Sequence, residues 1–570
     1  MPNTQYERWL SQAIDDKDLK PELLSIHGVE SEINDRFAVE LEFGTAGLRG
    51  VLGAGTNRMN IYMVRKATQG LANYLLSTKG EKAVAISYDS RIKSNLFAQN
   101  AASVLAANGI TVHIYKELMP VPALSFATRY LHCDAGIMVT ASHNPAKYNG
   151  YKAYGADGCQ MTSEAADTVY AEMLKTDVFE DVKLIAFEDG VANGSIKFIE
   201  QDVIEALYEN IKAQSVRKGL CAKAGLKLVY SPLNGSGNVP VRRILADIGI
   251  TDITVVPEQE HPDGNFPTCP YPNPEIRETL SLGLALAEKL NADLMLATDP
   301  DADRVGIAVR NEKGGYELLS GNEVGVLLLD YICAARIENG TMPKNPIMVK
   351  SLVSTCLADM VAKNYGVEPI NVLTGFKYIG EQIHLLEEKG EAERFVFGFE
   401  ESYGYLSGTY VRDKDAVVAS MLICEMAAYY KSIGKSVLIA LQEIYTKYGR
   451  WLHKVDSLEF AGLSGMDKMK DIMSSLRSVP PKELAELKIV RSADYLTHVM
   501  LDNITGKEEQ INLPAANVLI WWLENGASVI VRPSGTEPKI KVYYSTSGKT
   551  LAEADAMRIQ LAQAVAPLVK

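Results

Sequence analysis

Apolar and polar positions follow one repeated order through most of the chain. Apolar runs of a few residues, each followed by a polar or glycine-containing loop, predict strands at 84–87, 111–115 and 137–139. Longer stretches with a period near 3.6 residues predict helices at 63–77 and 95–108, the second followed by Gly109 as a stop signal. Short strands that alternate with helices are typical of an α/β fold.

The same layout recurs twice further along the chain. Strands are predicted at 226–230, 254–256 and 293–297, with a helix at 279–290, and then at 346–349 and 394–397. Each of the three sections offers two apolar runs that end in a polar loop. This repetition predicts three similar α/β domains.

The last section has a different pattern. Helices at 466–476 and 551–568 flank strands at 518–522, 528–531 and 540–544, which is typical of a small α+β domain. A length of 570 residues fits about four domains. We therefore expect three α/β domains at 1–202, 203–321 and 322–453, and an α+β domain at 454–570.

The composition of the chain indicates which kinds of molecule it can bind. The chain is 47% hydrophobic and 23% charged, as in ordinary globular proteins, and its net charge is −13. An acidic protein is a poor binder of nucleic acid or anionic membranes, so an anionic substrate must be held by particular Arg and Lys side chains. A polar start and the lack of a long apolar run predict no membrane association. Seven scattered cysteines predict reduced thiols in a cytoplasmic protein.

Ser142 and His143 follow the strand at 137–139, in the loop TASHNP. Loops at strand ends carry the chemistry of α/β sheets, and a serine nucleophile needs activating neighbours. Lys152 lies ten residues further on, after an Asn-Gly turn, and a lysine close to the serine could serve as a cation, an acid or a base. Read alone, the same loop fits an ordinary Asn-Pro turn.

Asp299, Asp301 and Asp303 alternate in the loop TDPDADR after the strand at 293–297. In an extended loop, three such carboxylates can converge on one point, where they repel one another unless a cation lies among them. Oxygen ligands without His or Cys favour Mg²⁺, with Mn²⁺ and Ca²⁺ as alternatives. The other interpretation is a solvated acidic loop.

Two further loops have the composition of anion sites. FGTAGLRG places Arg49 among three glycines, whose backbone N–H groups can face an anion. The segment that begins at Arg532 offers a guanidinium, two hydroxyls and a glycine backbone, which is a phosphate cradle without a P-loop. Each is also compatible with a plain turn.

Taken together, TASHNPAKYNGYK, DPDADR, GFEES, RPSGTEPK and FGTAGLRG closely resemble the motifs of the α-D-phosphohexomutase family, the phosphoglucomutases and phosphomannomutases. The motifs fall in the family's order and span nearly the whole chain. The resemblance is strongest to the phosphoglucomutase subgroup that includes phosphopentomutase-like members. It implies three α/β domains with mixed sheets and a C-terminal α+β domain around a central cleft.

The resemblance also implies residue roles. Ser142 would carry a phosphoryl group, and Mg²⁺ would be held by Asp299, Asp301, Asp303 and a phosphoserine oxygen. His143, Lys152, Arg49 and Arg304 would complete the catalytic set. The substrate would be bound by Thr374, Gly375, Lys377, Glu400, Ser402, Lys414, Arg532, Ser534, Gly535 and Thr536.

The implied reaction interconverts glucose 1-phosphate and glucose 6-phosphate, with glucose 1,6-bisphosphate as intermediate and activator. The same scaffold leaves open a phosphomannomutase or a phosphopentomutase. More remote alternatives are a Mg²⁺-dependent phosphatase with an aspartate nucleophile and a non-catalytic sugar-phosphate binding protein. We expect small sugar phosphates as the only partners, and a monomer or weak homodimer.

Overall fold

The computed structural model describes residues 2–44, 47–460, 465–534 and 539–570. Helices α1 (Pro2–Gln12), α2 (Leu19–Ser25) and α3 (Glu30–Phe37) precede the first sheet. Its strands are ordered β1-β5-β4-β2-β3-β6. They are β1 (Gly47–Val51), β2 (Ala83–Tyr88), β3 (Thr111–Ile114), β4 (Ala135–Val139), β5 (Tyr148–Gly155) and β6 (Ile196–Phe198). Its helices are α4 (Ile61–Leu76), α5 (Ser94–Ala107), α6 (Val121–Tyr130), α7 (Ser163–Lys175) and α8 (Phe187–Ala192).

The second sheet is ordered β11-β10-β9-β7-β8. Its strands are β7 (Leu228–Ser231), β8 (Ile253–Val255), β9 (Leu294–Thr298), β10 (Val305–Arg310) and β11 (Tyr316–Leu319). The accompanying helices are α9 (Gln201–Lys212), α10 (Cys221–Ala224), α11 (Asn238–Asp247), α12 (Pro257–Glu260) and α13 (Ser281–Leu290), the last preceded by a short 3₁₀ turn, Arg277–Leu280.

The third sheet is ordered β13-β12-β14-β15. It contains β12 (Ile347–Ser351), β13 (Glu368–Val372), β14 (Phe395–Glu400) and β15 (Gly404–Leu406). Its helices are α14 (Gly321–Glu338), α15 (Leu357–Asn364), α16 (Phe376–Glu388), α17 (Ala416–Ser432) and α18 (Val437–Tyr448), and a 3₁₀ turn spans Ala392–Arg394.

One four-strand arrangement recurs in all three sheets. The orders β5-β4-β2-β3, β10-β9-β7-β8 and β15-β14-β12-β13 match position for position. In each, three strands run parallel and the first-named strand runs antiparallel to its neighbour. This confirms the predicted α/β repeat with mixed sheets. It also means that the loops β4–β5, β9–β10 and β14–β15 occupy equivalent positions in their sheets.

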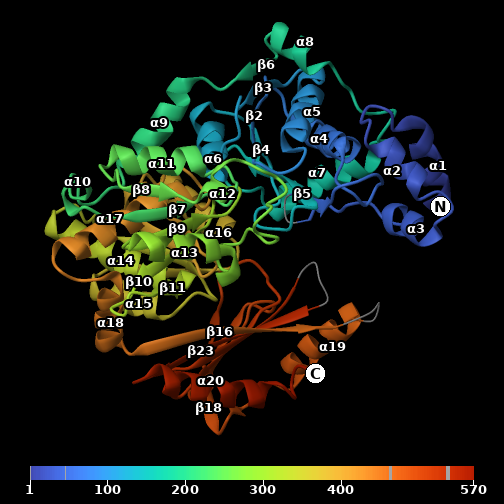
Figure 1. The fold of residues 1–570 in the computed structure, drawn as a ribbon. Helices are drawn as coiled ribbons and strands as arrows, with labels where there is room; N and C mark the ends of the chain where they lie inside the picture. Colours follow the sequence, from blue (N-terminus) through green and yellow to red (C-terminus); the bar gives the residue numbers. More distant parts are fainter. Residues whose placement is uncertain (1, 45–46, 461–464, 535–538) are drawn as a thin grey trace.

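The C-terminal unit is an antiparallel sheet covered by α19 (Gly465–Ser478) and α20 (Leu551–Val565). Its strands follow the order β16-β23-β22-β21-β18-β19-β20, with β17 beside β18. They are β16 (Arg450–Glu459), β17 (Glu483–Leu484), β18 (Leu487–Asp494), β19 (Val499–Asp502), β20 (Glu508–Gln510), β21 (Leu519–Leu523), β22 (Ser528–Pro533) and β23 (Lys539–Gly548). The predicted α+β class is confirmed. Figure 1 shows this unit, in orange and red, below the three α/β units.

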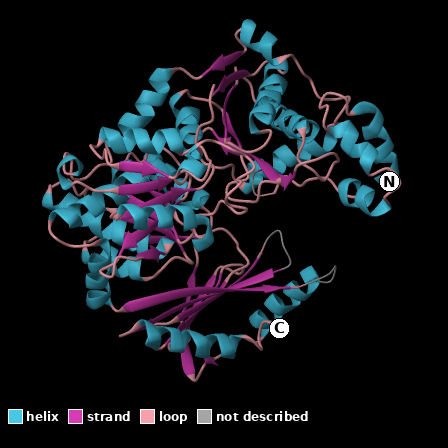
Figure 2. Ribbon diagram, viewed as in Figure 1, coloured by secondary structure: helices cyan, strands magenta, loops and turns pink. Residues whose placement is uncertain are grey.

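The hydrophobic cores connect the first three units closely with one another, but not with the fourth. One continuous core joins the first three units, with residues of α6, α9 and α17 among its members. The C-terminal unit has its own core around Trp521, and meets the third unit through a small cluster that includes Leu352, Ile530 and Tyr543. Helices flank the sheets of the α/β units, as Figure 2 shows by colour. The fourth unit is therefore attached by much less shared apolar surface.

The expected domain limits at 202/203, 321/322 and 453/454 stay predictions, and each falls inside an element, α9, α14 or β16. In the described part of the chain, no single helix is long and apolar enough to cross a membrane. Among the described helices, only α17 and α18 taken together reach that length and composition, and they meet at an angle of 89°.

The seam between the second and third units contains a buried carboxyl group, Glu425 on α17. It accepts hydrogen bonds from Ser215 Oγ, from Tyr331 Oη at 3.0 Å, and from the backbone N–H groups of Val216 and Arg217 at 3.1 and 3.2 Å. Removing one acceptor would leave several buried donors unsatisfied, which is costly.

We expect Glu425→Ala to destabilise the protein by about 3 kcal/mol or more. The matched control is Glu443→Ala, which removes an exposed ion pair with Lys435 and should cost less than about 1 kcal/mol. The measurement is urea unfolding followed by tryptophan fluorescence. Equal losses in the two variants would contradict the structural role of Glu425.

Candidate active site

Ser142 lies in the loop between β4 and β5, where the chain reverses from a parallel to an antiparallel strand. Its side chain is buried and its φ is +51°, the left-handed region that non-glycine residues seldom adopt. Its Oγ lies 3.1 Å from Nδ1 of His143 and donates to Oδ2 of Asp299 at 3.0 Å. The predicted serine thus directly contacts the predicted metal loop.

Arg91 fixes the loop between β4 and β5 by hydrogen bonds to its backbone. Its guanidinium donates to the carbonyl oxygens of Ser142, at 2.5 Å, of Asn144, and of Pro145 and Tyr148, at 3.1 and 3.0 Å. The same group lies 5.0 Å from the ring of Phe266, which comes from the second unit. Sequence reasoning missed Arg91, although YDSR follows a predicted strand as the other candidate loops do.

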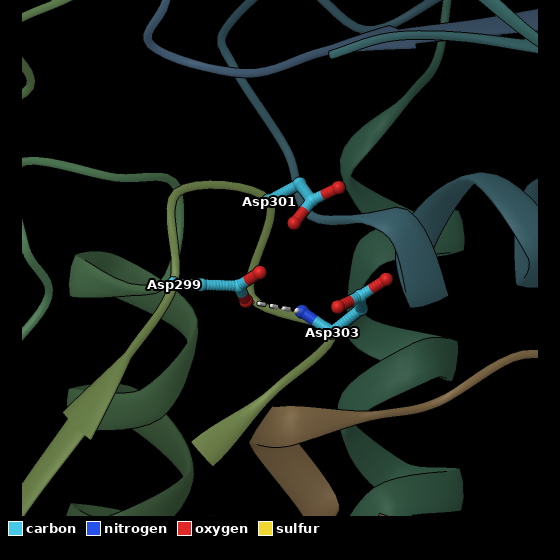
Figure 3. A group of neighbouring side chains, drawn as sticks. All are labelled: Asp299, Asp301 and Asp303. Atoms are coloured by element: carbon cyan, nitrogen blue, oxygen red, sulfur yellow. Dashed lines mark hydrogen bonds between the residues drawn. The ribbon is translucent and has the colours of Figure 1, made fainter. Parts of the chain in front are cut away.

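Asp299, Asp301 and Asp303 lie in the hairpin loop between β9 and β10, and all three are buried. One oxygen from each lies within 4.8 Å of the other two, so the carboxylates surround one common space (Figure 3). The loop geometry is fixed because Asp299 Oδ1 accepts from the backbone N–H groups of Asp303, at 3.2 Å, and of Arg304, at 2.9 Å.

Cations from two other units surround the three carboxylates. Lys152 on β5 lies 3.0 Å from Asp301 Oδ2 and 3.9 Å from Asp303 Oδ2. Lys414, in the third unit, lies 3.2 Å from Asp303 Oδ2, so it faces the metal loop and not only a sugar site. Arg304 lies 3.7 Å from Asp303 and pairs with Glu275 at 2.8 Å.

These contacts shift the proton affinities in opposite directions. Burial and the other two carboxylates raise the pKa of Asp299 well above its ordinary value. Burial acts on Asp301 in the same sense, but Lys152, a hydrogen bond with Asp299 and the charge of Lys414 together outweigh it and hold the pKa of Asp301 at about 2. Burial and Arg304 lower the pKa of His143 to about 2, so its ring is neutral at physiological pH.

The donor set fits a hard divalent cation. Asp301 Oδ1 and Asp303 Oδ1 are buried and have no hydrogen-bond partner in the described part of the chain. Buried carboxylate oxygens without partners are costly, and a metal ion would satisfy them. An all-oxygen set of this kind suits Mg²⁺.

Strand β14 ends at Glu400, which is buried, and the loop that follows it contains Ser402. Glu400 Oε1 accepts from the backbone N–H of Gly375 at 2.6 Å, which joins GFEES to the TGFK segment. Thr374 Oγ1 is buried without a partner among the described residues. Burial and the neighbouring Glu401 raise the pKa of Glu400 to about 7.

Four of the remaining predicted residues can be placed. Arg49 on β1 pairs in register with Gly150 on β5, and its charge acts on Asp301 and Asp303. Lys377 is the second residue of α16, where burial lowers its pKa, and its Nζ lies 5.1 Å from the ring centroid of Tyr378. Arg532 lies at the end of β22, followed by Ser534. Gly535 and Thr536 lie outside the described residues.

Family models match the chain in the same order as these loops. The phosphoglucomutase/phosphomannomutase α/β/α domains I, II and III match residues 40–179, 203–314 and 320–448, and the C-terminal domain matches 516–561. Three α/β/α domains followed by a C-terminal domain, matched in this order, define a known class of multidomain protein. The chain belongs to the phosphoglucomutase/phosphomannomutase family.

Named relatives agree with this assignment. A phosphoglucomutase of Staphylococcus aureus (strain MSSA476) is 38% identical over 520 residues, which cover 90% of this chain and 92% of that protein. Among solved structures, pp63/parafusin, a phosphoglucomutase from Paramecium, has a TM-score of 0.69 at 18% identity and covers 93% of this chain and 96% of its own. A phosphoglucomutase/phosphomannomutase family protein of Burkholderia thailandensis has a TM-score of 0.67 at 18% identity, with coverage of 92% and 97%. The two structures support the fold.

We expect Arg91→Lys to loosen the serine loop, because an ammonium group cannot reach four carbonyl oxygens in the geometry of a guanidinium. Amide hydrogen exchange in residues 140–149 should become about tenfold faster or more. Arg129→Lys is the matched control, since Arg129 donates to the carbonyls of Thr409 and Tyr410, both at 3.0 Å, at another seam. Unchanged exchange in residues 140–149 would show that Arg91 does not hold the loop.

Proposed function

We propose that the protein is a phosphoglucomutase that interconverts glucose 1-phosphate and glucose 6-phosphate, with Ser142 as the phosphoryl carrier and glucose 1,6-bisphosphate as intermediate. The observation that carries this proposal is the contact of Ser142 Oγ with Asp299 at 3.0 Å, inside a cluster where Asp301 Oδ1 and Asp303 Oδ1 have no hydrogen-bond partner among the described residues. The Staphylococcus aureus relative named phosphoglucomutase supports it.

The proposed step moves one phosphoryl group. The bond between phosphorus and Ser142 Oγ breaks, and a bond forms between phosphorus and a sugar hydroxyl oxygen. The hydroxyl gives up one proton and Ser142 Oγ regains one, so the step needs no net acid or base. Repetition in the reverse sense at the other end of the sugar completes the isomerisation and restores the phosphoserine.

The side chains around Ser142 stabilise charge on the transferring group. Lys152, Arg49 and Arg304 supply positive charge, which suits the loose transition state of phosphoryl transfer. Mg²⁺ held by Asp299, Asp301, Asp303 and the phosphoserine would add Lewis-acid charge neutralisation. His143 lies against Ser142 Oγ and orients it.

In this proposal, residues of the third and fourth units bind the substrate. Glu400 accepts from adjacent sugar hydroxyls, Ser402 can donate or accept, and Thr374 offers its unpaired hydroxyl. Lys377 and Lys414 add positive charge beside the sugar, with the Gly375 backbone fixing Glu400. Arg532, Ser534, Gly535 and Thr536 hold the phosphate that does not react.

Glucose is the preferred sugar in this proposal. An epimer would misplace one hydroxyl and leave a buried partner unpaired, at a cost of about 1–3 kcal/mol. Mannose 1-phosphate should therefore react about tenfold to a hundredfold more slowly, and a pentose phosphate should span the site poorly. A phosphatase with an aspartate nucleophile would instead release inorganic phosphate.

We expect Ser142→Ala to lose nearly all mutase activity and to carry no phosphate by intact mass. The assay couples glucose 6-phosphate formation to a dehydrogenase, with mannose and ribose phosphates in parallel and inorganic phosphate measured separately. Ser420→Ala is the control, because Ser420 is a buried serine on α17 without a partner among the described residues. Full activity of Ser142→Ala, or phosphate release without isomerisation, would exclude the proposed mechanism.

The raised pKa of Glu400 makes a further prediction for pH. Below about pH 7 the carboxyl group is protonated and loses an acceptor for sugar hydroxyls, so kcat/KM should rise as the pH increases through 7. Glu400→Gln is neutral at every pH and should lower kcat/KM and remove this inflection. The substrate phosphate titrates equally in both enzymes, so the difference between the profiles isolates Glu400. Parallel profiles would refute the role.

A further inference from the structure

A pocket lies at the seam of the second and third units, and none of its lining residues belongs to the proposed catalytic site. It has a volume of 850 Å³ and opens where α9 leads into α10, against the C-terminal ends of α14 and α17. Helices α10 and α17 lie at the left edge of the view in Figure 1. Its lining carries four cations, Arg217, Lys218, Lys223 and Arg336, and no carboxylate. In a chain with a net charge of −13, this is a strong local excess of positive charge.

Arg336 has donors that the described part of the chain does not use. It lies in the last turn of α14, and no carboxylate lies within 4.0 Å of its guanidinium among the described residues. Its Nε is fully enclosed and has no acceptor there. Burial without a compensating negative charge lowers its pKa. A partly buried guanidinium with unused donors is costly, and an anion at its Nη groups would offset the part of that cost that does not come from the enclosed Nε.

The wall of the pocket is held in place without a ligand. The guanidinium of Arg217 lies 4.0 Å from the ring centroid of Tyr429 and pairs with Glu338. Asn339 Nδ2 donates to the carbonyl of Val216 at 2.7 Å, and Glu425 receives the N–H groups of the same loop. Cations that are already fixed lose little entropy when they bind a ligand.

Helix ends explain only part of this charge. α9, α14 and α17 all end at the pocket, and each C-terminus carries roughly half a negative charge. With Glu338 paired to Arg217 and the Glu425 carboxyl group directly behind the same loop, the four cations and these partial charges leave an excess of roughly half a positive charge. The surplus points to an anion from solution.

We propose that this pocket binds a small phosphorylated anion with at least two negative charges, such as pyrophosphate or an organic diphosphate. Arg336, Lys223 and Lys218 supply the charge-assisted hydrogen bonds, and Arg217 supplies a fixed cation at the wall. The site does not share residues with the proposed catalytic site, so it stands whether or not the sugar specificity is as proposed.

The test is isothermal titration calorimetry of the full chain with inorganic pyrophosphate, without divalent metal. Lys223→Gln/Arg336→Gln is compared with Lys79→Gln/Lys313→Gln, which removes the same charge from exposed lysines elsewhere. Neither variant changes a residue of the proposed catalytic site, so a difference between them reports the pocket. We expect pyrophosphate binding to weaken about tenfold or more in the first variant and to stay at the wild-type value in the second.

Two additions keep the test decisive. Lys223→Gln alone changes an exposed side chain and should weaken binding in the same direction, even where replacing Arg336 lowers the thermal unfolding midpoint. ADP as a second probe separates an organic diphosphate, which would bind more tightly than pyrophosphate, from the inorganic ion. Equal affinity in the pocket and control variants, or no binding to the wild type, overturns the proposal and leaves these cations only the role of offsetting helix ends.

Discussion

Three carboxylates within five residues, all removed from water, impose the main electrostatic constraint on this molecule. Asp299, Asp301 and Asp303 cannot remain together without positive charge close by. That charge comes from Lys152 in the first unit and Lys414 in the third. Backbone hydrogen bonds also join the aspartate loop to the first and third units. Val121 N–H donates to the carbonyl of Asp301, and Ala416 N–H donates to that of Ala302. The aspartate loop therefore connects the three α/β units to one another.

Because the hydrophobic cores are divided in this way, the fourth unit can change its position more easily than the first three. The first three share one continuous core, so they cannot separate without exposing it. The fourth has its own core and a small shared cluster with the third around Leu352 and Tyr543. The C-terminal unit, which carries Arg532, is the one whose position can change at little cost in buried apolar surface.

The sequence predicted the α/β repeat because hydrophobic periodicity is a local property. It also located the serine, aspartate and glutamate loops, since polar residues directly after a buried strand lie at the sheet edge. It did not predict the contact of Lys414 with Asp303 or the four carbonyls bound by Arg91, because both depend on which loops meet in space. The strands β16 and β18–β20 were missed because their residues are largely half-exposed or exposed and lack a strong apolar run.

The left-handed backbone of Ser142 limits which amino acids evolution can place there. A φ of +51° is tolerated by serine at modest cost, but the branched Cβ of threonine would clash with the backbone in this conformation. Threonine is otherwise the natural substitute for a serine that carries a phosphoryl group. Among side chains with an aliphatic hydroxyl, the backbone conformation of this loop therefore favours serine over threonine at position 142.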